Sequence, residues 1–567
     1  MLINAREIPQ DRLIRTEVCI IGSGPAGMTL AREFAGQNIQ VCLLESGNLD
    51  NDPQAQALSE AQTIGDPFLS PQITRNRQVG GNSNVWAIKT GNGQIGVRYA
   101  PLDAIDFEKR DWLPYSGWPF AKTELDPFYE RAQQVCQSGF YDYEAEFWES
   151  EEAQRLPLDP DRLITTMFQF GPKAVFHDRY RDQLIQSDNI HVYINATVLE
   201  IEANTPARTA TRVRVASTPG QEFWLEATVF VLAQGGMESA RLLLLSDRQQ
   251  ANGLGNQHDL VGRFFMDHPL VDGGVFVPAD PGLYDQMALY DLRQVKQHPV
   301  LGKLNPAPQL MRQQHLLNTA IVLFPRPSRR QWDAILAFKA LLEPLAKKQL
   351  PPQALQLLPK ILKGLDYVTL ASYLAATKKQ SLLHGFGRGG WSELSQNQHR
   401  FKGFEVLFQT EQAPDPSNRL ELSTDRDRFG CRKLQLHWKW GAIDSDSVAR
   451  MQDILAAELA AQGLGTYQIS RPNGRPKLCS PSGVAHHMGT TRMHDHPTQG
   501  VVDANCRVHG LSNLFIASSS VFPTGGYANP TLTIVALALR LADHLKQVLR
   551  QPPLELTSPE IPTVLES

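Results

Sequence analysis

The clearest pattern of hydrophobic and polar residues in the chain begins with a short apolar run near residue 18. Residues 17–47 read EVCIIGSGPAGMTLAREFAGQNIQVCLLESG. The run VCII predicts a buried parallel strand. After a glycine-rich turn, Met28, Ala31 and Phe34 recur at roughly helical spacing, and the run QVCLLE predicts a second strand. The order strand, turn, helix, strand predicts a βαβ unit in an α/β domain.

Two further patterns divide the rest of the chain. In TVFVLAQGG, an apolar strand runs into a glycine turn and then into the helical stretch MESARLLLL. The segments FEVLFQTEQ, NRLELS and KLQLHWKW instead alternate apolar and polar residues, which predicts an antiparallel sheet with one covered face. The predicted fold class is therefore α/β, with a Rossmann-like nucleotide-binding domain and an inserted α+β substrate domain built on an antiparallel sheet.

A chain of 567 residues suits two or three domains. The patterns assign residues 1–100, 190–275 and 478–550 to the nucleotide-binding domain, and residues 101–189 and 276–477 to the substrate domain. The Pro-rich residues 551–567 predict a flexible tail.

Residues 329–380 form a basic, Leu-rich insert, with nine Lys or Arg against three Asp or Glu. Its pattern predicts short amphipathic helices broken at Pro344, Pro351–Pro352 and Pro359. One interpretation is a flap that contacts an anionic membrane surface or a redox partner. The other, which is the favoured interpretation, is a helical insertion that packs on its own sheet and has a solvated basic face.

Charge, cysteine spacing and the lengths of apolar stretches argue against several classes of protein. The formal net charge is −4, which gives no global attraction for nucleic acid. The six cysteines show no CxxC and no paired spacing, which argues against a disulfide framework or a thiolate zinc site. The N-terminus lacks the apolar segment of a signal peptide, and no stretch of about 18 apolar residues occurs. We expect a cytoplasmic protein, with peripheral membrane association through residues 329–380 as an alternative.

The first glycine-rich turn carries the pattern GxGxxG at Gly22, Gly24 and Gly27. In such a unit the first glycine allows a tight turn, the second lets backbone approach a pyrophosphate, and the third lets helix and strand pack closely. Glu45, at the end of the second strand, is placed to accept hydrogen bonds from ribose hydroxyls. These residues predict a dinucleotide site, but they do not distinguish NAD from FAD.

Five histidines fall between His486 and His509, in AHHMGTTRMHDHPTQG and the residues after it. A metal site would need three or four converging nitrogen, oxygen or sulfur ligands. The segment HDH supplies two, and no third is evident, so no metal site is predicted.

Several stretches together resemble the glucose-methanol-choline (GMC) oxidoreductase family: IIGSGPAGMTLAREF with LLESG, VGGNSNVWAIKTG, VLAQGGMESARLLLLS, AHHMGTTRM, and GVVDANCRVHGLSNLFIASSSVFPTGGYANPTLTIVALALRLADHL. They occur in the family's order. GTTRM and YANPTLT are most similar to the pyranose-oxidase and sugar-dehydrogenase branch. The resemblance implies an FAD-binding domain of the GMC type, with FAD at the interface of the two domains.

The resemblance also implies oxidation of a CH–OH group, in a sugar, glycoside or other alcohol, by hydride transfer to flavin N5. Two alternatives stay open: a family member acting on a hydrophobic alcohol, and a non-redox flavoprotein (a lyase or photoenzyme) of the same fold. A dehydrogenase is favoured over an oxidase. The electron acceptor, which could be O₂, a quinone or a redox protein, is not predicted.

The family's catalytic pair maps onto His486 and Asn529 by alignment of AHHMGTTRM and PTGGYANPT. His486, taken as an imidazole with a pKa near 7, is the implied base for the hydroxyl proton. Asn529 is expected to donate its amide N–H to the substrate oxygen. His487 and His268 are interpreted as structural.

The resemblance also bears on how flavin is held. Covalently flavinylated pyranose oxidases carry a histidine immediately before the tryptophan of the GG…W loop, whereas this chain has Val85 before Trp86. Valine cannot form the flavin bond, so we predict non-covalent FAD. The remaining cofactor contacts implied are Gly81, Asn82, Asn84, Val85, Val198, Asp503, Ser520, Asn529, Pro530 and Thr531.

Overall fold

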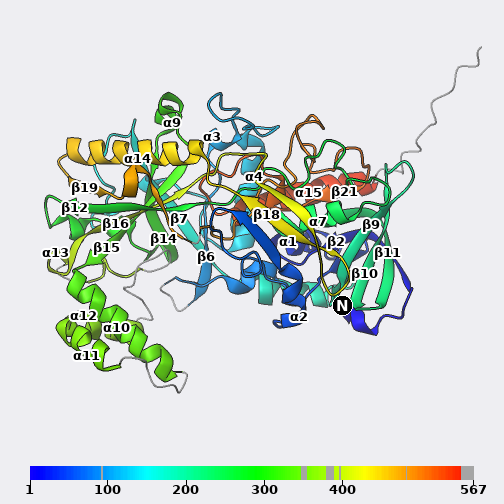
Figure 1. The fold of residues 1–567 in the computed structure, drawn as a ribbon, viewed down its shortest axis with the longest axis horizontal. Coiled ribbons are helices and arrows are strands. Elements are labelled where there is room, and N and C mark those ends of the chain that lie inside the picture. Colours follow the sequence, from blue (N-terminus) through cyan, green and yellow to red (C-terminus); the bar gives the residue numbers. More distant parts are fainter. Residues whose placement is uncertain (91–93, 347–353, 378–388, 395–396, 481, 551–567) are drawn as a thin grey trace, which may run out of the picture.

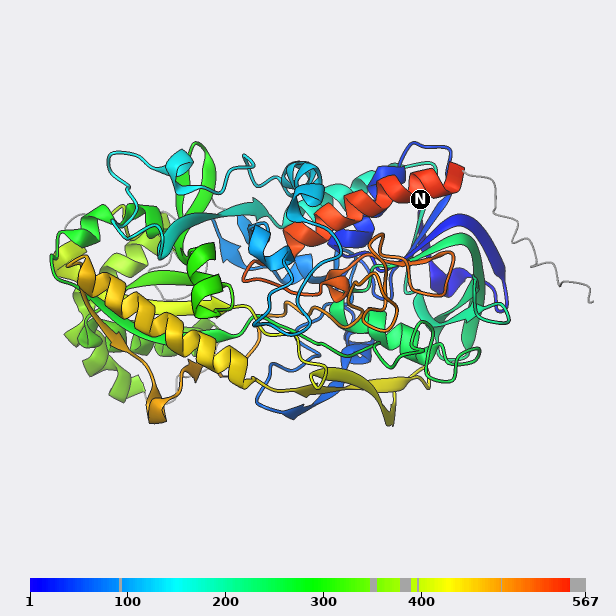
Figure 2. The same ribbon diagram turned by 90° about the horizontal axis from the view of Figure 1, so that it is seen from above.

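The computed structural model describes residues 1–567 except 91–93, 347–353, 378–388, 395–396, 481 and 551–567. The predicted tail therefore lies outside the described residues. Figures 1 and 2 show an elongated molecule, with one large sheet toward each end. Among the described residues, no helix combines the length and apolar character needed to cross a bilayer.

The first sheet contains the predicted βαβ unit: β2 (Leu13–Ile21), the helix α1 (Pro25–Phe34) and β3 (Val41–Leu44). Val18–Ile21 and Val41–Leu44 are buried, as their unbroken apolar runs require. The long helix α15 (Thr531–Arg550) packs against α1 and α4 (Lys122–Cys136). The strand order is β1 (Leu2–Asn4), β8 (Ile190–Ile194), β3 (Val41–Leu44), β2 (Leu13–Ile21), β11 (Gln221–Leu232), β10 (Ala210–Thr218) and β9 (Thr197–Ala203), with β21 (Leu514–Ile516) also paired to β11.

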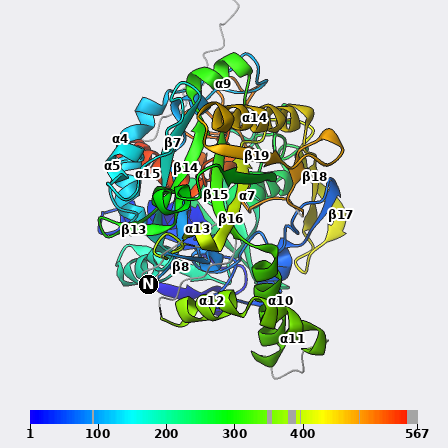
Figure 3. The ribbon, with the colours of Figure 1, turned by 90° about the vertical axis from the view of Figure 1, so that its left-hand side faces the viewer.

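The second sheet has ten strands, and each of its strand pairs is antiparallel, as expected for the substrate domain. Its order is β19 (Gly465–Ile469), β12 (Leu270–Pro278), β16 (Phe401–Thr410), β15 (Thr319–Pro327), β14 (His298–Pro306), β7 (Leu163–Pro172), β6 (Ile95–Tyr99) and β5 (Ile88–Lys89), with β13 (Arg293–Val295) on β14 and β20 (Lys477–Leu478) on β12. The helix α14 (Ala442–Ala461) covers one face (Figure 3) and buries Val448, Met451 and Leu455 against it.

Several strands lie in a different sheet from the one that the pattern indicated. Residues 88–99 hold β5 and β6, and both belong to the ten-stranded sheet although they precede residue 100. Strands β17 (Arg419–Arg426) and β18 (Arg432–Trp438) are antiparallel as predicted, but they pair with β4 (Ala61–Gly65) in a separate three-stranded sheet. Alternation shows that a strand has one covered face, and it does not show which neighbour supplies the hydrogen bonds.

The basic insert folds as three helices, α10 (Arg329–Ala346), α11 (Ala354–Lys363) and α12 (Leu365–Thr377), which project from the end of the molecule that carries the ten-stranded sheet (Figures 1 and 3). The predicted breaks at Pro344 and Pro359 are wrong, because both prolines lie inside helices. A helix can continue past a proline when the unpaired carbonyl is satisfied otherwise. Pro351–Pro352 lie outside the described residues.

The remaining α-helices among the described residues are mostly short, apart from α7, which is largely buried. They are α2 (Pro53–Gln56), α3 (Ala104–Phe107), α5 (Ala145–Trp148), α6 (Arg181–Gln186), α7 (Gly235–Leu245), α8 (Leu283–Gln286), α9 (Pro308–Gln314) and α13 (Asn397–Arg400).

Candidate active site

The glycines after β2 shape a turn that other residues would not fit. Gly22 has φ +106°, and a Cβ there would lie 2.6 Å from the Ala233 carbonyl oxygen. A Cβ on Gly27 would lie 1.9 Å from the Gly22 carbonyl oxygen, so helix and strand touch at this point. Gly24 is the N-cap of α1, with an ordinary φ of −69°, and a Cβ there would meet no protein atom within 4 Å. The space beside Gly24 is a cavity.

This cavity has a volume of about 490 Å³ and lies between the two sheets, since both Leu44 of β3 and Gln409 of β16 line it. Most of the residues singled out from the sequence lie on its wall. They are Gly22, Gly24, Glu45, Gly81, Asn82, Val85, Val198, His486, Asn529, Pro530 and Thr531.

Four of the singled-out residues, Gly27, Asn84, Asp503 and Ser520, do not line the cavity. Gly27 packs on Gly22, and Asn84 donates its amide to backbone carbonyls within its own turn. Asp503 accepts backbone N–H groups of its own turn. Ser520 is buried and hydrogen-bonded to other hydroxyl side chains.

His486 and Asn529 meet on the cavity wall. The Nε2 atom of His486 lies 3.1 Å from the amide nitrogen of Asn529, and its Nδ1 atom lies 2.8 Å from Nδ1 of His268. The side-chain oxygen of Asn529 accepts a hydrogen bond of 3.0 Å from Nε of Arg98, which sits on β6. The amide group of Asn529 is therefore turned toward His486.

These contacts fix which nitrogen of His486 carries its proton. His268 Nε2 faces the Gly525 carbonyl oxygen at 3.3 Å, and a carbonyl only accepts, so this nitrogen is the N–H of His268. The Nδ1 atom of His268 then has a lone pair, and His486 Nδ1 donates to it. The Nε2 atom of His486 is left as the unprotonated nitrogen beside Asn529, on the cavity side.

The environment keeps these imidazoles neutral. Burial, then the neighbouring His268, Arg98 and His487, lower the pKa of His486 well below its usual 6.5. Burial lowers the pKa of His268 to about 4. The expected pKa near 7 for His486 is therefore wrong, because sequence spacing does not show that another imidazole and a guanidinium lie beside the ring. A depressed pKa still leaves the lone pair available at neutral pH.

A buried carboxylate anchors the loop that carries His486. Asp267 accepts backbone N–H bonds from His268, Val484 and His486. Burial raises the pKa of Asp267 to about 6. His487, the next residue, is buried against the rings of Phe68 and Phe265, and burial lowers its pKa to about 3.

Comparison with known proteins identifies this arrangement. A family model described as GMC oxidoreductase matches residues 414–538, and one described as FAD binding domain matches residues 15–63. The chain is 33% identical to paromamine 6'-oxidase of Streptomyces fradiae, over 93% of this chain and 90% of that protein. The chain belongs to the GMC oxidoreductase family. The resemblance found in the sequence is thus confirmed, and members of this family are FAD-dependent oxidoreductases of CH–OH groups.

Another sequence relative and a solved structure are also similar to this GMC oxidoreductase. The chain is 27% identical to the fructose dehydrogenase large subunit of Gluconobacter japonicus, over 63% of this chain and 54% of that protein. A solved fungal aryl-alcohol oxidase has the same fold, with a TM-score of 0.52 at 14% identity over 94% of this chain and 99% of that one. The relatives include dehydrogenases and oxidases, so the preference for a dehydrogenase stays a prediction.

The cavity residues of this GMC oxidoreductase fit FAD. The N-terminus of α1 directs backbone N–H groups and its positive dipole end toward the cavity, which suits a pyrophosphate. Glu45, fixed by the Ser23 hydroxyl at 2.6 Å and the Gly47 N–H at 2.8 Å, also lines the wall. The buried side-chain oxygens of Gln234 and Asn76 lack a hydrogen-bond partner among the described residues, and both residues line the cavity. Polar groups of a bound dinucleotide would satisfy them.

Replacing Gly24 with valine tests this cradle. Overpacking costs about 1–3 kcal/mol, so the Kd for FAD rises about tenfold or more as the side chain fills the space beside the helix N-terminus. Titration of the apoprotein with FAD, followed by flavin fluorescence, measures the change. Gly441→Val is the matched control, because Gly441 is also a helix N-cap with an ordinary φ of −80° and does not line the cavity. Equal FAD affinity in both variants would show that the cofactor lies elsewhere.

An arginine cluster also lines the cavity, and no pattern in the sequence predicts it. Glu238 on α7 contacts Arg75, Arg77 and Arg241, and the arginines lower its pKa to about 2. Arg75 and Arg77 belong to a loop whose sequence has neither helical nor strand periodicity. Their contact with α7 is formed only in the folded chain.

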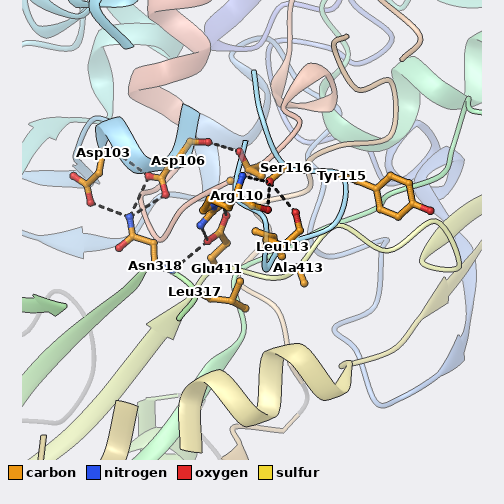
Figure 4. A network of polar contacts seen from close by, with 12 residues as sticks. Asp103, Asp106, Arg110, Leu113, Tyr115, Ser116, Leu317, Asn318, Glu411 and Ala413 are labelled. Atoms are coloured by element: carbon orange, nitrogen blue, oxygen red, sulfur yellow. Dashed lines mark hydrogen bonds and ion pairs between the residues drawn. The ribbon is translucent and has the colours of Figure 1, made fainter. Parts of the chain in front are cut away.

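The end of β16 is held by a buried polar network (Figure 4). Arg110 binds Glu411 through two hydrogen bonds of 2.8 and 2.6 Å, and both side chains are fully buried. Asn318 donates its backbone N–H to Glu411 and its amide to Asp106. Burial, then the neighbouring Glu411, raise the pKa of Asp106 well above its usual value. The network fixes the stretch that begins at Gln409, whose amide reaches the oxygen of Asn529 at 3.5 Å.

The other histidines of the C-terminal cluster hold a loop together. His494 accepts the backbone N–H of His496 at 2.9 Å, and His509 donates to the His494 carbonyl oxygen at 2.8 Å. Within the part of the chain that the structure describes, no three His, Cys, Asp or Glu side chains gather closely enough to hold a metal ion.

Proposed function

We propose that this protein oxidises a CH–OH group of a sugar or glycoside, with His486 as base and Asn529 as the donor to the substrate oxygen. The observation that carries the proposal is the pair itself: on the wall of the cavity the amide nitrogen of Asn529 lies 3.1 Å from the unprotonated Nε2 of His486. A substrate hydroxyl on the cavity side of the pair can displace this contact, give its proton to Nε2 and accept a hydrogen bond from the amide, which stabilises the developing negative charge on oxygen. FAD, when bound, accepts the hydride from the substrate carbon.

Polar groups around the pair support a sugar rather than a hydrophobic alcohol. Arg98 and Gln409 line the same wall and hold the Asn529 oxygen, so the wall beside the reacting hydroxyl is polar. The relatives named for fructose and for paromamine act on carbohydrates by name. We propose that FAD is bound non-covalently, since Val85 lines the cavity and offers no nucleophile to the ring.

An anaerobic titration tests the function. Sugars and glycosides are added to the holoenzyme while the absorbance of oxidised flavin is followed, and bleaching by a sugar is the expected result. Bleaching by aliphatic or aryl alcohols alone would overturn the substrate class. Bound flavin that no CH–OH compound reduces would favour the non-redox alternative. Acid precipitation of the same sample should release the flavin into the supernatant if the bond is non-covalent.

His268 is expected to act as a positioning residue through the tautomer of His486. When His486 takes the proton, its Nδ1–H bond to His268 becomes a bond from a cation, which is worth about 1.5–3 kcal/mol. His268→Phe removes the acceptor, so the rate constant of flavin reduction falls about 10- to 100-fold while KM changes little. Stopped-flow reduction measures both quantities.

The conservative variant is the control for His268. His268→Asn can place an oxygen where Nδ1 lies and still accept the proton of His486, so it should recover most of the rate. If both variants reduce flavin at equal rates, or if only KM changes, the tautomer argument fails.

A further inference from the structure

The three helices α10–α12 are enriched in exposed apolar side chains relative to their length. Sixteen large apolar side chains are exposed in the part of the chain that the structure describes, and eight of them lie on these helices. Isolated exposed leucines are ordinary, but a concentration on one unit marks an interaction surface. The unit projects from the end of the molecule in Figures 1 and 3, where a large planar partner could reach it.

Helix α11 shows how the surface is built. Leu355, Leu358 and Leu362 follow the spacing i, i+3, i+7 and are 84%, 44% and 68% exposed. Residues at this spacing share one face of a helix. Ile361 points the other way and is buried with Ala334 of α10 in a small core belonging to the unit. The outward leucines therefore do not serve the packing of the unit.

Positive charge accompanies the leucines. Lys360 and Lys363 are exposed on α11, and Arg329 and Arg330 are exposed at the start of α10. Over residues 329–380 the sequence has an excess of six positive charges, in a chain whose net charge is −4. Leucines on one face with Lys and Arg beside them are the composition of a helix that lies in the plane of an anionic membrane.

We propose that the α10–α12 unit docks on an anionic membrane surface. The leucines of α11, with Leu342 and Leu345 of α10, enter the boundary between headgroups and acyl chains, and the lysines and arginines contact lipid phosphates. A second copy of the chain is a poorer occupant, because two units of like charge repel each other. The proposal takes up the membrane-contact interpretation of the insert in place of the solvated basic face, and it does not depend on which alcohol the enzyme oxidises.

Vesicle sedimentation of the full-length holoenzyme tests the proposal. Vesicles of phosphatidylcholine alone are compared with vesicles containing about 30% phosphatidylglycerol, and the expected partition coefficient is at least about tenfold higher on the anionic vesicles. Sodium chloride at about 0.5 M should reduce that difference, since it screens the charges. Absence of binding to both kinds of vesicle would overturn the proposal.

Two variants separate the apolar and charged contributions. The triple change Leu355→Ser, Leu358→Ser and Leu362→Ser should lower the partition coefficient at least about tenfold. The pair Lys360→Glu and Lys363→Glu should remove the preference for anionic vesicles. Both variants should keep their bound flavin, which shows that they fold.

The control is a second set of exposed apolar residues outside the unit. Ile73→Ser and Ile443→Ser replace side chains that are 68% and 40% exposed, and membrane binding should not change. Equal loss of binding in this control would mean that the unit is not the docking surface. If the leucine triple instead abolishes a concentration-dependent dimer in the absence of lipid, the occupant is a second copy and the membrane proposal is wrong.

Discussion

Replacing His486 with alanine slows anaerobic flavin reduction by about 10²- to 10⁴-fold, the usual contribution of a positioned general base. The hydroxyl proton then loses its acceptor beside Asn529, because Arg98 and Gln409, which contact the Asn529 oxygen, are donors toward it. Stopped-flow absorbance of the oxidised flavin at saturating substrate gives the rate constant.

His496→Ala provides the control for this prediction. His496 is exposed and belongs to the same histidine-rich segment, but it does not line the cavity. Its removal should leave both flavin content and reduction rate unchanged. A His486→Ala enzyme that binds FAD and still reduces it at the wild-type rate would eliminate the proposed base and leave the family assignment intact.

The pH dependence of the wild-type enzyme follows from the same contacts. A base works when it is unprotonated, and the pKa of His486 lies well below 6.5, so the reduction rate should be constant from about pH 7 to 8. As pH falls through about 6, protonation of Asp267 weakens its hold on the His486 loop, and the rate declines. A rate that titrates with a midpoint near 7 would show that the imidazole is not shielded as the structure indicates.

The parts of the fold that could be predicted are those encoded by neighbouring residues. The unit from β2 to β3 needs an apolar run, a glycine turn and a helical stripe within about thirty residues, and all three are visible in the sequence. Assignment of strands to sheets is different, because β4 pairs with β18, and their paired residues are 373 positions apart in the sequence. No local pattern records such a pairing, so the predicted segment boundaries and the observed sheets disagree there.

Some residues of the candidate site could be predicted from sequence motifs, and others could be found only in the structure. His486 and Asn529 were found because motifs resembling a family carry them, whereas spacing alone favoured neither. His268 was interpreted as structural, although it lies 2.8 Å from His486 across 218 residues of sequence. Its role depends on which atom faces which, and a sequence does not contain that information. Arg98, on the other sheet, was missed for the same reason.

Arg110→Met is expected to lower the free energy of unfolding by about 3–5 kcal/mol, because it leaves the buried carboxylate of Glu411 without its counter-charge. Urea unfolding of the holoenzyme, followed by circular dichroism and flavin release, measures the loss. Arg312→Met is the matched control, since Arg312 also binds a glutamate, Glu108, but that pair is 47% and 40% exposed. Exposed pairs contribute about 0–1 kcal/mol, so this control should unfold almost as the wild type does.

The double variant Arg110→Met with Glu411→Leu decides whether charge or shape holds the end of β16. A buried ion pair replaced by apolar side chains of similar volume is often nearly neutral in stability, so the double variant should regain more than half of the loss. If it regains nothing, the geometry of the hydrogen bonds to Asn318 matters more than neutralisation of the carboxylate. The rate of flavin reduction distinguishes a role of the ion pair in stability from a role in positioning Asn529, because Gln409 lies two residues before Glu411 and contacts Asn529. A stable double variant with slow reduction would mean that the ion pair serves the position of the catalytic asparagine rather than the stability of the sheet.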